Sequence, residues 1–180
     1  MDFYRIGEKL VSRDKIIRAV DRMLDLRQQG LSQTDVASRL KIDRTLVSRL
    51  EALGEVRTGG PIAIVGFPVA NKAEIQAVAD EEGVDYTLLF TDEERWAFVQ
   101  QKDGLSLFND IMDILIRLRQ HRTVIVIGSE FRVKLAQGLI DGQVISVPLG
   151  RSPITGDRTV DIDLLRSVIR RIKGTEGDAT

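Results

Sequence analysis

The strongest constraint on the fold comes from two short apolar runs, IAIVGF at 62–67 and TVIVI at 123–127, in which apolar and polar residues do not alternate. A strand with one face in water shows such alternation, whereas a strand covered on both faces does not. The two runs therefore predict strands of a parallel sheet covered by helices. Further strands are predicted at 86–90 and 143–147, and helices at 72–82, 92–120 with a break near Lys102, 131–140 and 162–172.

A different, helical pattern occupies residues 33–51, QTDVASRLKIDRTLVSRLE. Ser32 is placed to cap a first short helix, and Asp43 is placed to cap a second helix after a break at residues 41–42. Ala37 is small enough to let the two helices cross closely. The segment therefore predicts two short helices packed at a steep angle.

The second of these helices has two chemically different faces. The apolar face is predicted to pack, and it consists of Leu46, Val47, Leu50 and Leu53. Arginine can donate two hydrogen bonds to O6 and N7 of guanine, and serine and threonine hydroxyls can bond bases or phosphates. The other face carries these residue types and suits the DNA major groove: Arg44, Thr45, Ser48 and Arg49.

The segment resembles the helix-turn-helix of phage-repressor-type and partition-protein-type DNA-binding proteins on six residues: Gln33, Ala37, Ile42, Val47, Leu50 and Glu51. The resemblance covers about a third of the chain at most. It implies that Gln33 contacts a phosphate and that Arg44, Thr45, Ser48 and Arg49 face the groove. The departure is Lys41, where that pattern usually has glycine, so a strained or differently shaped turn is expected. An ordinary helical hairpin with solvated arginines is the alternative.

The chain divides into two predicted domains. Residues 14–29 predict a helix that ends at Gly30, so residues 1–58 are expected to form an all-α helix-turn-helix domain. Its first dozen residues are expected to form a short extra helix or an arm against a partner chain. The run GEVRTGGP at 54–61 favours a connector, and residues 59–174 then form a small Rossmann-like α/β domain followed by a flexible tail at 175–180.

One predicted helix, at 105–120, carries an unusually wide apolar stripe. Such width indicates burial on more than one side. The helix is expected either to lie between the sheet and a neighbouring helix or to form part of a subunit interface. The stripe consists of Leu107, Ile111, Ile114, Leu115 and Leu118.

Ligands of an open parallel sheet lie beyond the carboxyl ends of its strands, where loops and helix N-termini supply N–H groups. The turn at 128–130 is the best anion candidate, since glycine permits close approach and a serine adds a hydroxyl. Helix capping alone is the alternative reading of that turn. The candidate ligand-binding residues are Gly66, Asn71, Thr91, Gly128, Ser129 and Glu130.

Several kinds of chemistry have no support in the sequence. The chain has no cysteine and one histidine, which excludes thiolate sites and a histidine cluster within one chain. It has neither GxGxxG after the first strand nor GxxxxGK[ST], and Ser129 has only His121 as a base, expected at the opposite end of the same strand. Asp161 is placed to cap the last helix rather than to hold a metal. No metal, cofactor or enzymatic activity is predicted.

Charge and hydropathy bear on partners and location. Residues 1–60 contain 12 Lys and Arg residues and 9 Asp and Glu residues. Residues 61–180 contain 14 Lys and Arg residues and 18 Asp and Glu residues. The excess of positive charge is small, so a dimer is expected to be needed for enough phosphate contacts. No apolar run approaches the roughly 20 residues of a membrane helix, and the N-terminus lacks the apolar core of a secretory signal. A cytoplasmic protein without membrane partners is expected.

These expectations favour a dimeric, sequence-specific transcriptional regulator that binds double-stranded DNA. In it, the α/β domain would oligomerise or sense a small-molecule effector. One alternative is a small α/β enzyme with a helical domain that tethers it to nucleic acid. Another is a DNA-bound scaffold without a ligand.

Overall fold

The structure is a computed structural model that describes residues 2–174, so the tail predicted at 175–180 lies outside the described residues. Its contacts divide the chain into two compact units, Met1–Glu55 and Val56–Thr180, which we call the N-terminal unit and the C-terminal unit. The division falls slightly before the boundary predicted near Gly59. Each unit has a hydrophobic core of its own.

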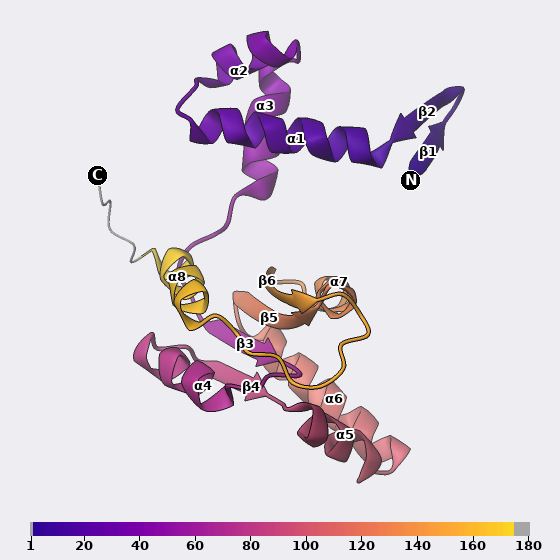
Figure 1. The fold of residues 1–180 in the computed structure, drawn as a ribbon, viewed down its shortest axis with the longest axis vertical. Coiled ribbons are helices and arrows are strands. Elements are labelled where there is room, and N and C mark those ends of the chain that lie inside the picture. Colours follow the sequence, from indigo (N-terminus) through magenta and orange to yellow (C-terminus); the bar gives the residue numbers. More distant parts are fainter. Residues whose placement is uncertain (1, 175–180) are drawn as a thin grey trace. The chain divides into compact units, whose positions relative to one another are not determined.

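The N-terminal unit begins with an antiparallel hairpin, β1 (Phe3–Ile6) and β2 (Lys9–Ser12) (Figure 1). The predictions of an all-α domain and of an extra helix at the N-terminus are therefore wrong. Gly7 opens the two-residue loop with φ 59°, a conformation that glycine adopts without steric cost and that hairpin loops require. The aromatic and β-branched residues of the hairpin add to the strand preference.

Three helices follow the hairpin: α1 (Arg13–Gln28), α2 (Gln33–Leu40) and α3 (Arg44–Gly54). The predicted caps are confirmed, because the Ser32 hydroxyl accepts from Asp35 N and the Asp43 carboxylate accepts from Thr45 N. The helices enclose a small core of buried side chains, consisting of Met23, Leu26, Val36, Ala37 and Val47.

Helix α1 contributes only a few of its apolar residues to this core. Ile16, Ile17 and Leu24 are exposed, and only Met23 and Leu26 of this helix are buried. The reason is that the core residues of α2 and α3 meet the last part of α1 and leave its first turns uncovered.

The turn between α2 and α3 places Lys41 in the left-handed region, with φ 54° and ψ 46°. The backbone N–H of Ile42 donates to the carbonyl of Ala37 over 3.0 Å and so closes the end of α2. A side chain at this conformation is unfavourable because Cβ crowds the neighbouring carbonyl oxygen. The strained turn expected from the lysine is confirmed.

We expect Lys41→Gly to raise the free energy of unfolding of the N-terminal unit by about 0.5–1 kcal/mol. Removing Cβ relieves roughly 1–2 kcal/mol of left-handed strain, while the freer unfolded chain offsets about half of that gain. Urea unfolding followed by far-ultraviolet circular dichroism measures the change. Lys41→Ala is the control, since it removes the charge but keeps Cβ. Equal stability of the two variants would contradict the strain argument.

The C-terminal unit contains a four-stranded parallel sheet in the order β4-β3-β5-β6, which confirms the predicted sheet. Its strands are β3 (Ile62–Gly66), β4 (Tyr86–Leu89), β5 (Thr123–Ser129) and β6 (Gln143–Gly150). Its helices are α4 (Lys72–Glu81), α5 (Asp92–Gln100), α6 (Gly104–Arg119), α7 (Glu130–Leu139) and α8 (Ile162–Lys173). The break predicted near Lys102 separates α5 from α6.

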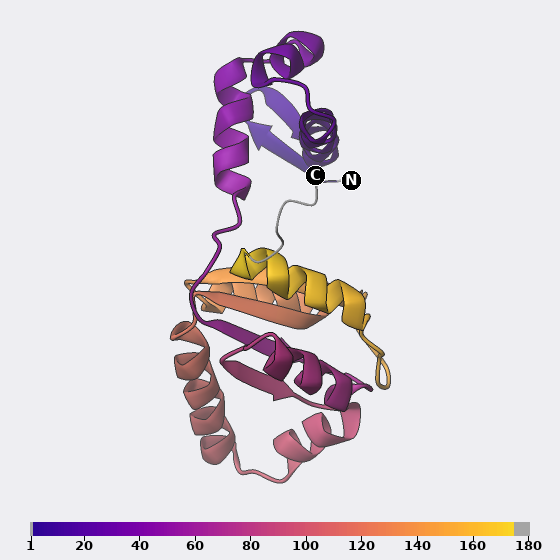
Figure 2. The same cartoon turned by 90° about the vertical axis from the view of Figure 1, so that its left-hand side faces the viewer.

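Helices cover both faces of this sheet (Figure 2). On one face, Ile62 and Ile64 of β3 pack with buried residues of α4 and α8. On the other face, Ala63 and Val65 pack with Leu118 of α6 and with residues of α7. Successive side chains of a strand point to opposite faces, so a strand buried on both faces must be apolar throughout. This is why the two apolar runs lack alternation.

Helix α6 is not enclosed between two layers. Leu118 is its only buried residue, and Ile114 packs partly against the sheet-face core. Of the predicted stripe, Leu118 is buried, Leu107, Ile114 and Leu115 are half-buried, and Ile111 is exposed. Large apolar side chains remain exposed on this helix, namely Leu105, Phe108, Ile111, Met112 and Ile116.

Candidate nucleic-acid interface

The first turn of α3 is fixed by its cap. The Asp43 carboxylate accepts a hydrogen bond of 2.6 Å from the backbone N–H of Thr45. Bonds from Thr45 lower the pKa of Asp43 below its ordinary value of 3.8, so the carboxylate stays charged at neutral pH. A charged cap satisfies free N–H groups at the start of a helix. It therefore holds Arg44 and Thr45 at a defined position in the first turn.

The free face of α3 has the four residues that the sequence assigned to it. Arg44, Thr45, Ser48 and Arg49 are all exposed, while Val47 is fully buried on the packed side. Both hydroxyl-bearing side chains on this face are exposed, and the Thr45 side chain also bonds the Asp43 carboxylate. The face combines two guanidinium groups with two hydroxyl groups on one short helix.

The packed side of α3 is narrower than predicted. Leu46 and Leu53 were expected to pack, but they are 47% and 82% exposed. Leu46 lies about 100° around the helix from Val47, beyond the strip that α1 and α2 reach. Leu53 lies on the same side as Leu46, in the last turn of α3. Only Val47 and, in part, Leu50 join the core.

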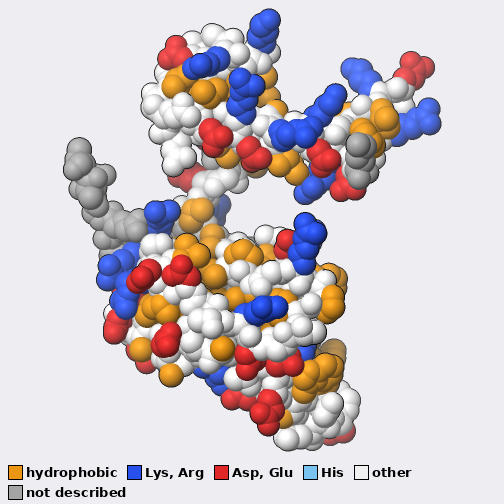
Figure 3. All heavy atoms as spheres, in the orientation of Figure 1, with side chains coloured by type: hydrophobic (Ala, Val, Ile, Leu, Met, Phe, Trp, Pro, Cys, Tyr) orange, Lys and Arg blue, Asp and Glu red, His pale blue; other side chains and the backbone are white. Residues whose placement is uncertain are grey.

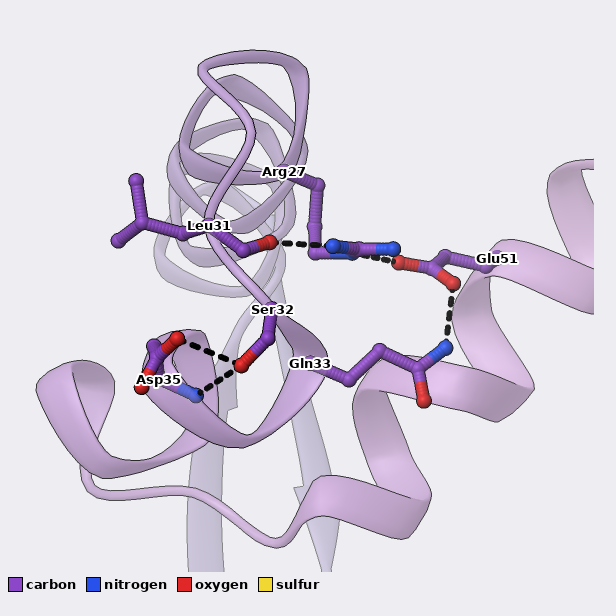
Figure 4. A network of polar contacts seen from close by, with 6 residues as sticks. All are labelled: Arg27, Leu31, Ser32, Gln33, Asp35 and Glu51. Carbon is purple, nitrogen blue, oxygen red and sulfur yellow. Dashed lines mark hydrogen bonds and ion pairs between the residues drawn. The ribbon is translucent and has the colours of Figure 1, made fainter.

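A polar network joins the three helices through Glu51 of α3 (Figure 4). Arg27 of α1 donates to the Glu51 carboxylate and also to the backbone carbonyl of Leu31. The Gln33 side-chain N–H group at the start of α2 donates to the other oxygen of Glu51 over 2.6 Å. The network fixes α3 against both of the other helices.

The network changes the interpretation of Gln33, which the resemblance assigned to a phosphate contact. Gln33 is half-buried, and its amide nitrogen is bonded to Glu51. An amide group carries two donor hydrogens and one acceptor oxygen, so the bond uses one donor and leaves the second. Gln33 therefore has a structural contact within the unit whatever else it binds.

We expect the N-terminal unit to lose stability in acid because of Glu51. Hydrogen bonds from Arg27, and then from Gln33, lower the pKa of Glu51 below its ordinary value of 4.5. A carboxylate whose pKa is lower in the folded state stabilises that state above its unfolded pKa. This stabilisation is lost as the pH falls below about 4.5 and through the lower folded value. Thermal unfolding between pH 3 and pH 7 measures the loss.

Glu51→Gln is the matched variant for this acid dependence. It keeps the shape of the side chain but cannot ionise, so the difference in midpoint between the two proteins should shrink as the pH falls. The carboxylate of Asp43 is present in both proteins and cancels from the comparison. A difference that stays constant across the range would show that the Glu51 charge has no such role.

In the C-terminal unit, three predicted ligand residues are engaged in the fold. The Asn71 amide donates to the Val160 carbonyl over 3.0 Å and accepts from Val160 N over 2.9 Å. Thr91 forms a capping box with Glu94 at the start of α5. A Cβ added at Gly66 would come within 2.9 Å of a Leu89 methyl carbon, so glycine is needed there for packing.

The other three predicted residues lie where β5 passes into α7. Ser129 is fully buried, and its Oγ makes neither a cap bond nor any other hydrogen bond. Gly128 lies against the Phe67 carbonyl and the Arg132 side chain, and Glu130 is exposed. The structure therefore brings the ends of β3 and β5 together, as the parallel order requires.

Sequence reasoning missed two arginines at this edge of the sheet, Arg95 of α5 and Arg132 of α7. A cation in the first turn of a helix is unfavourable, because that end of the helix carries partial positive charge. Arg132 in the first turn of α7 was therefore a signal in the sequence. Arg95 gave no such signal, since its relation to Arg132 arises only in the folded chain.

The described part of the chain, residues 2–174, contains no group of three or more His, Cys, Asp or Glu side chains placed to hold a metal ion. Within the same residues, no helix has both the length and the apolar content needed to cross a bilayer. Comparison with known proteins gave no matching family model and no significant similarity to a curated protein or a solved structure.

Proposed function

We propose that this protein is a sequence-specific, DNA-binding transcriptional regulator whose α2 and α3 form a helix-turn-helix. The observation that carries the proposal is the exposed face of α3, where Arg44, Thr45, Ser48 and Arg49 are all exposed while Val47 of the same helix is buried. A helix fits the major groove, where arginine reads guanine and hydroxyl groups bond bases or phosphates. The capped start of α3 supports this role, since recognition helices contact bases near their N-terminal ends.

The proposal includes a homodimer. A single unit offers few phosphate contacts, and two copies related by a two-fold axis would double them. The protein has apolar surface suited to such an interface: Figure 3 shows hydrophobic side chains on the visible surfaces of both units. The exposed residues include Phe3 and Tyr4 of the hairpin, Ile16 of α1, and Phe108 and Ile116 of α6.

The C-terminal unit is assigned the second half of the proposed function, oligomerisation or the sensing of a small effector. A parallel sheet with helices on both faces supplies a rigid base for either role. An effector would act by binding the DNA-competent arrangement of a dimer more tightly, or less tightly, than the incompetent one. A regulator of this kind acts in the compartment that holds the DNA, which for a bacterial-type cell is the cytoplasm.

In vitro selection of duplex DNA by the purified full chain tests the proposal. We expect enrichment of one motif with two inverted half-sites about 10 base pairs apart, centre to centre, as a two-fold dimer requires. Enrichment of a single half-site would retain DNA binding but reject the dimer. Recovery of a pool as diverse as the starting library would reject sequence-specific binding.

A further inference from the structure

A largely apolar cavity of ≈ 320 Å³ lies at the carboxyl ends of β3 and β4, next to α5 and α6. This volume falls within the range of small-molecule sites, which are mostly apolar with a few placed polar groups. The cavity also adjoins the point where the sheet order reverses, since β3 and β5 are neighbours and their following helices, α4 and α7, cover opposite faces. Its apolar lining includes Phe67, Leu88, Phe90, Phe98, Ile114 and Leu115.

Two guanidinium groups line the same cavity. Arg132 lies over the Phe67 ring, with its guanidinium carbon 4.6 Å from the ring centroid. Arg95 lies over the Trp96 ring at 4.7 Å and donates to the Asp92 carboxylate over 2.6 Å. Asp92 therefore neutralises Arg95, and Arg132 has no ion pair with a carboxylate in the described residues.

Both arginines that line this cavity have a buried nitrogen without a partner. Within residues 2–174, the buried side-chain nitrogen and oxygen atoms that lack a hydrogen bond belong to Arg95, Ser129 and Arg132. Buried polar atoms are nearly always bonded, because leaving one without a partner is unfavourable. The unpaired atoms of Arg95 and Arg132, which both line the cavity, indicate a missing acceptor there.

The electrostatics favour an acceptor with negative charge. Burial lowers the pKa of Arg132, and the nearby charge of Arg95 lowers it further, while Asp92 acts in the opposite direction. Because Arg95 is already paired, the site has close to one positive charge to be neutralised. One negative charge therefore fits better than two.

We infer that this cavity binds an organic monocarboxylate with an apolar body of roughly ten non-hydrogen atoms, at about 30 Å³ for each water-sized group. The carboxylate accepts hydrogen bonds from the free donors of Arg132, and the apolar body fills the space between Phe67, Phe98 and Leu115. Arginine suits this task because its planar fork matches a carboxylate. This ligand would be the effector of the regulator proposed above, so its biological role rests on that proposed function.

The test uses the full chain without DNA, with octanoate as the probe. Trp96 is the only tryptophan in the chain and lies beside Arg95, so its fluorescence reports on the cavity. We expect a saturable change with octanoate, weaker binding of 1-octanol and no binding of octylamine, which is repelled by the arginines. Isothermal titration calorimetry gives the affinities independently of the fluorescence.

Matched variants distinguish the effect of the Arg132 charge on ligand binding from the effect of the cavity's shape. Arg132→Gln should weaken octanoate binding about 10- to 100-fold and leave 1-octanol unaffected, because it removes the charged donor alone. Leu115→Phe should weaken both ligands by filling the cavity, and the exposed Lys134→Gln on the same helix should change neither. Far-ultraviolet circular dichroism checks that each variant is folded, and Arg132→Lys provides a second, charge-preserving substitution with intermediate affinity.

Three results would overturn the inference: no saturable binding of octanoate, equal affinity for octanoate and 1-octanol, or unchanged affinity in the folded Arg132→Gln and Arg132→Lys variants. None of them concerns DNA, so the inference can fail while the selection experiment still finds a motif. If octanoate binds but no motif is enriched, the cavity assignment stands and the regulator assignment fails.

Discussion

Replacing Arg44 or Arg49 with alanine should remove most sequence-specific DNA binding. Each arginine that reads a base contributes roughly 1–3 kcal/mol, which corresponds to about a 5- to 150-fold loss of affinity for the selected motif. Both side chains are exposed, so the thermal unfolding midpoint should hardly change. Fluorescence anisotropy with the selected duplex, and with a scrambled duplex of equal length, measures the two affinities.

Arg44→Lys and Arg49→Lys are the controls for this experiment. Lysine keeps the charge but lacks the planar fork that makes two bonds to one guanine. We therefore expect these variants to bind the scrambled duplex as the parent does and to discriminate less well between the two duplexes. Alanine variants that bind the motif as tightly as the parent would show that this face of α3 does not enter the groove.

Met23→Ala should unfold the N-terminal unit and leave the C-terminal unit folded. Met23 is 1% exposed and lies in the small core that all three helices share. Truncating a buried methionine to alanine costs about 2–5 kcal/mol, which is a large part of the stability of a small unit. We expect the helical signal of this unit to be lost at room temperature or to melt at a much lower temperature.

Unfolding of the C-terminal unit can be followed separately by tryptophan fluorescence, because Trp96 belongs to that unit. Its fluorescence should melt at the same temperature in Met23→Ala as in the parent, while circular dichroism shows the earlier transition. Leu24→Ala is the neighbouring control, since Leu24 is 45% exposed and its loss should cost little. A single transition shifted in both signals would contradict separate cores.

The parts of the fold that could be predicted from the sequence share one property: the local residue types match the burial or the helix end that the structure gives them. The strands at Ile62 and Thr123 are buried on both faces, so their apolar runs were unambiguous. Ser32, Asp43 and Asp161 have the short polar side chains that helix starts require, and each caps a helix in the structure. The break between α5 and α6 likewise followed from local residues.

The errors arose where an apolar pattern was assumed to be covered. Several apolar side chains of α1 and α6 remain exposed, among them Ile16 and Phe108, and periodicity alone does not tell which turns of a helix have a neighbour. The hairpin at Phe3–Ser12 was missed because its strands are short, largely exposed and without a regular alternation. Periodicity identifies an apolar face but not its partner.

The candidate sites also differ in whether local sequence or contacts between distant segments define them. The exposed residues of α3 followed from helical geometry within a few turns, so the sequence was sufficient to place them on one face. The cavity combines Phe67, Arg95 and Arg132, which come from three different segments and meet only when the sheet is formed. The sequence led instead to Asn71 and Thr91, whose polar groups are used to hold loops and helix ends.

The strand order of the sheet has a consequence for the way this chain acquires its structure. β3 pairs with β5, which follows it in the chain only after α4, β4, α5 and α6. Loops of that length must close before the central pair forms, and such distant pairings slow folding. The helices at the N-terminus need only near neighbours and leave the ribosome earlier. We therefore expect the helical unit to reach its native state during translation, while the sheet is completed only after β5 has been synthesised.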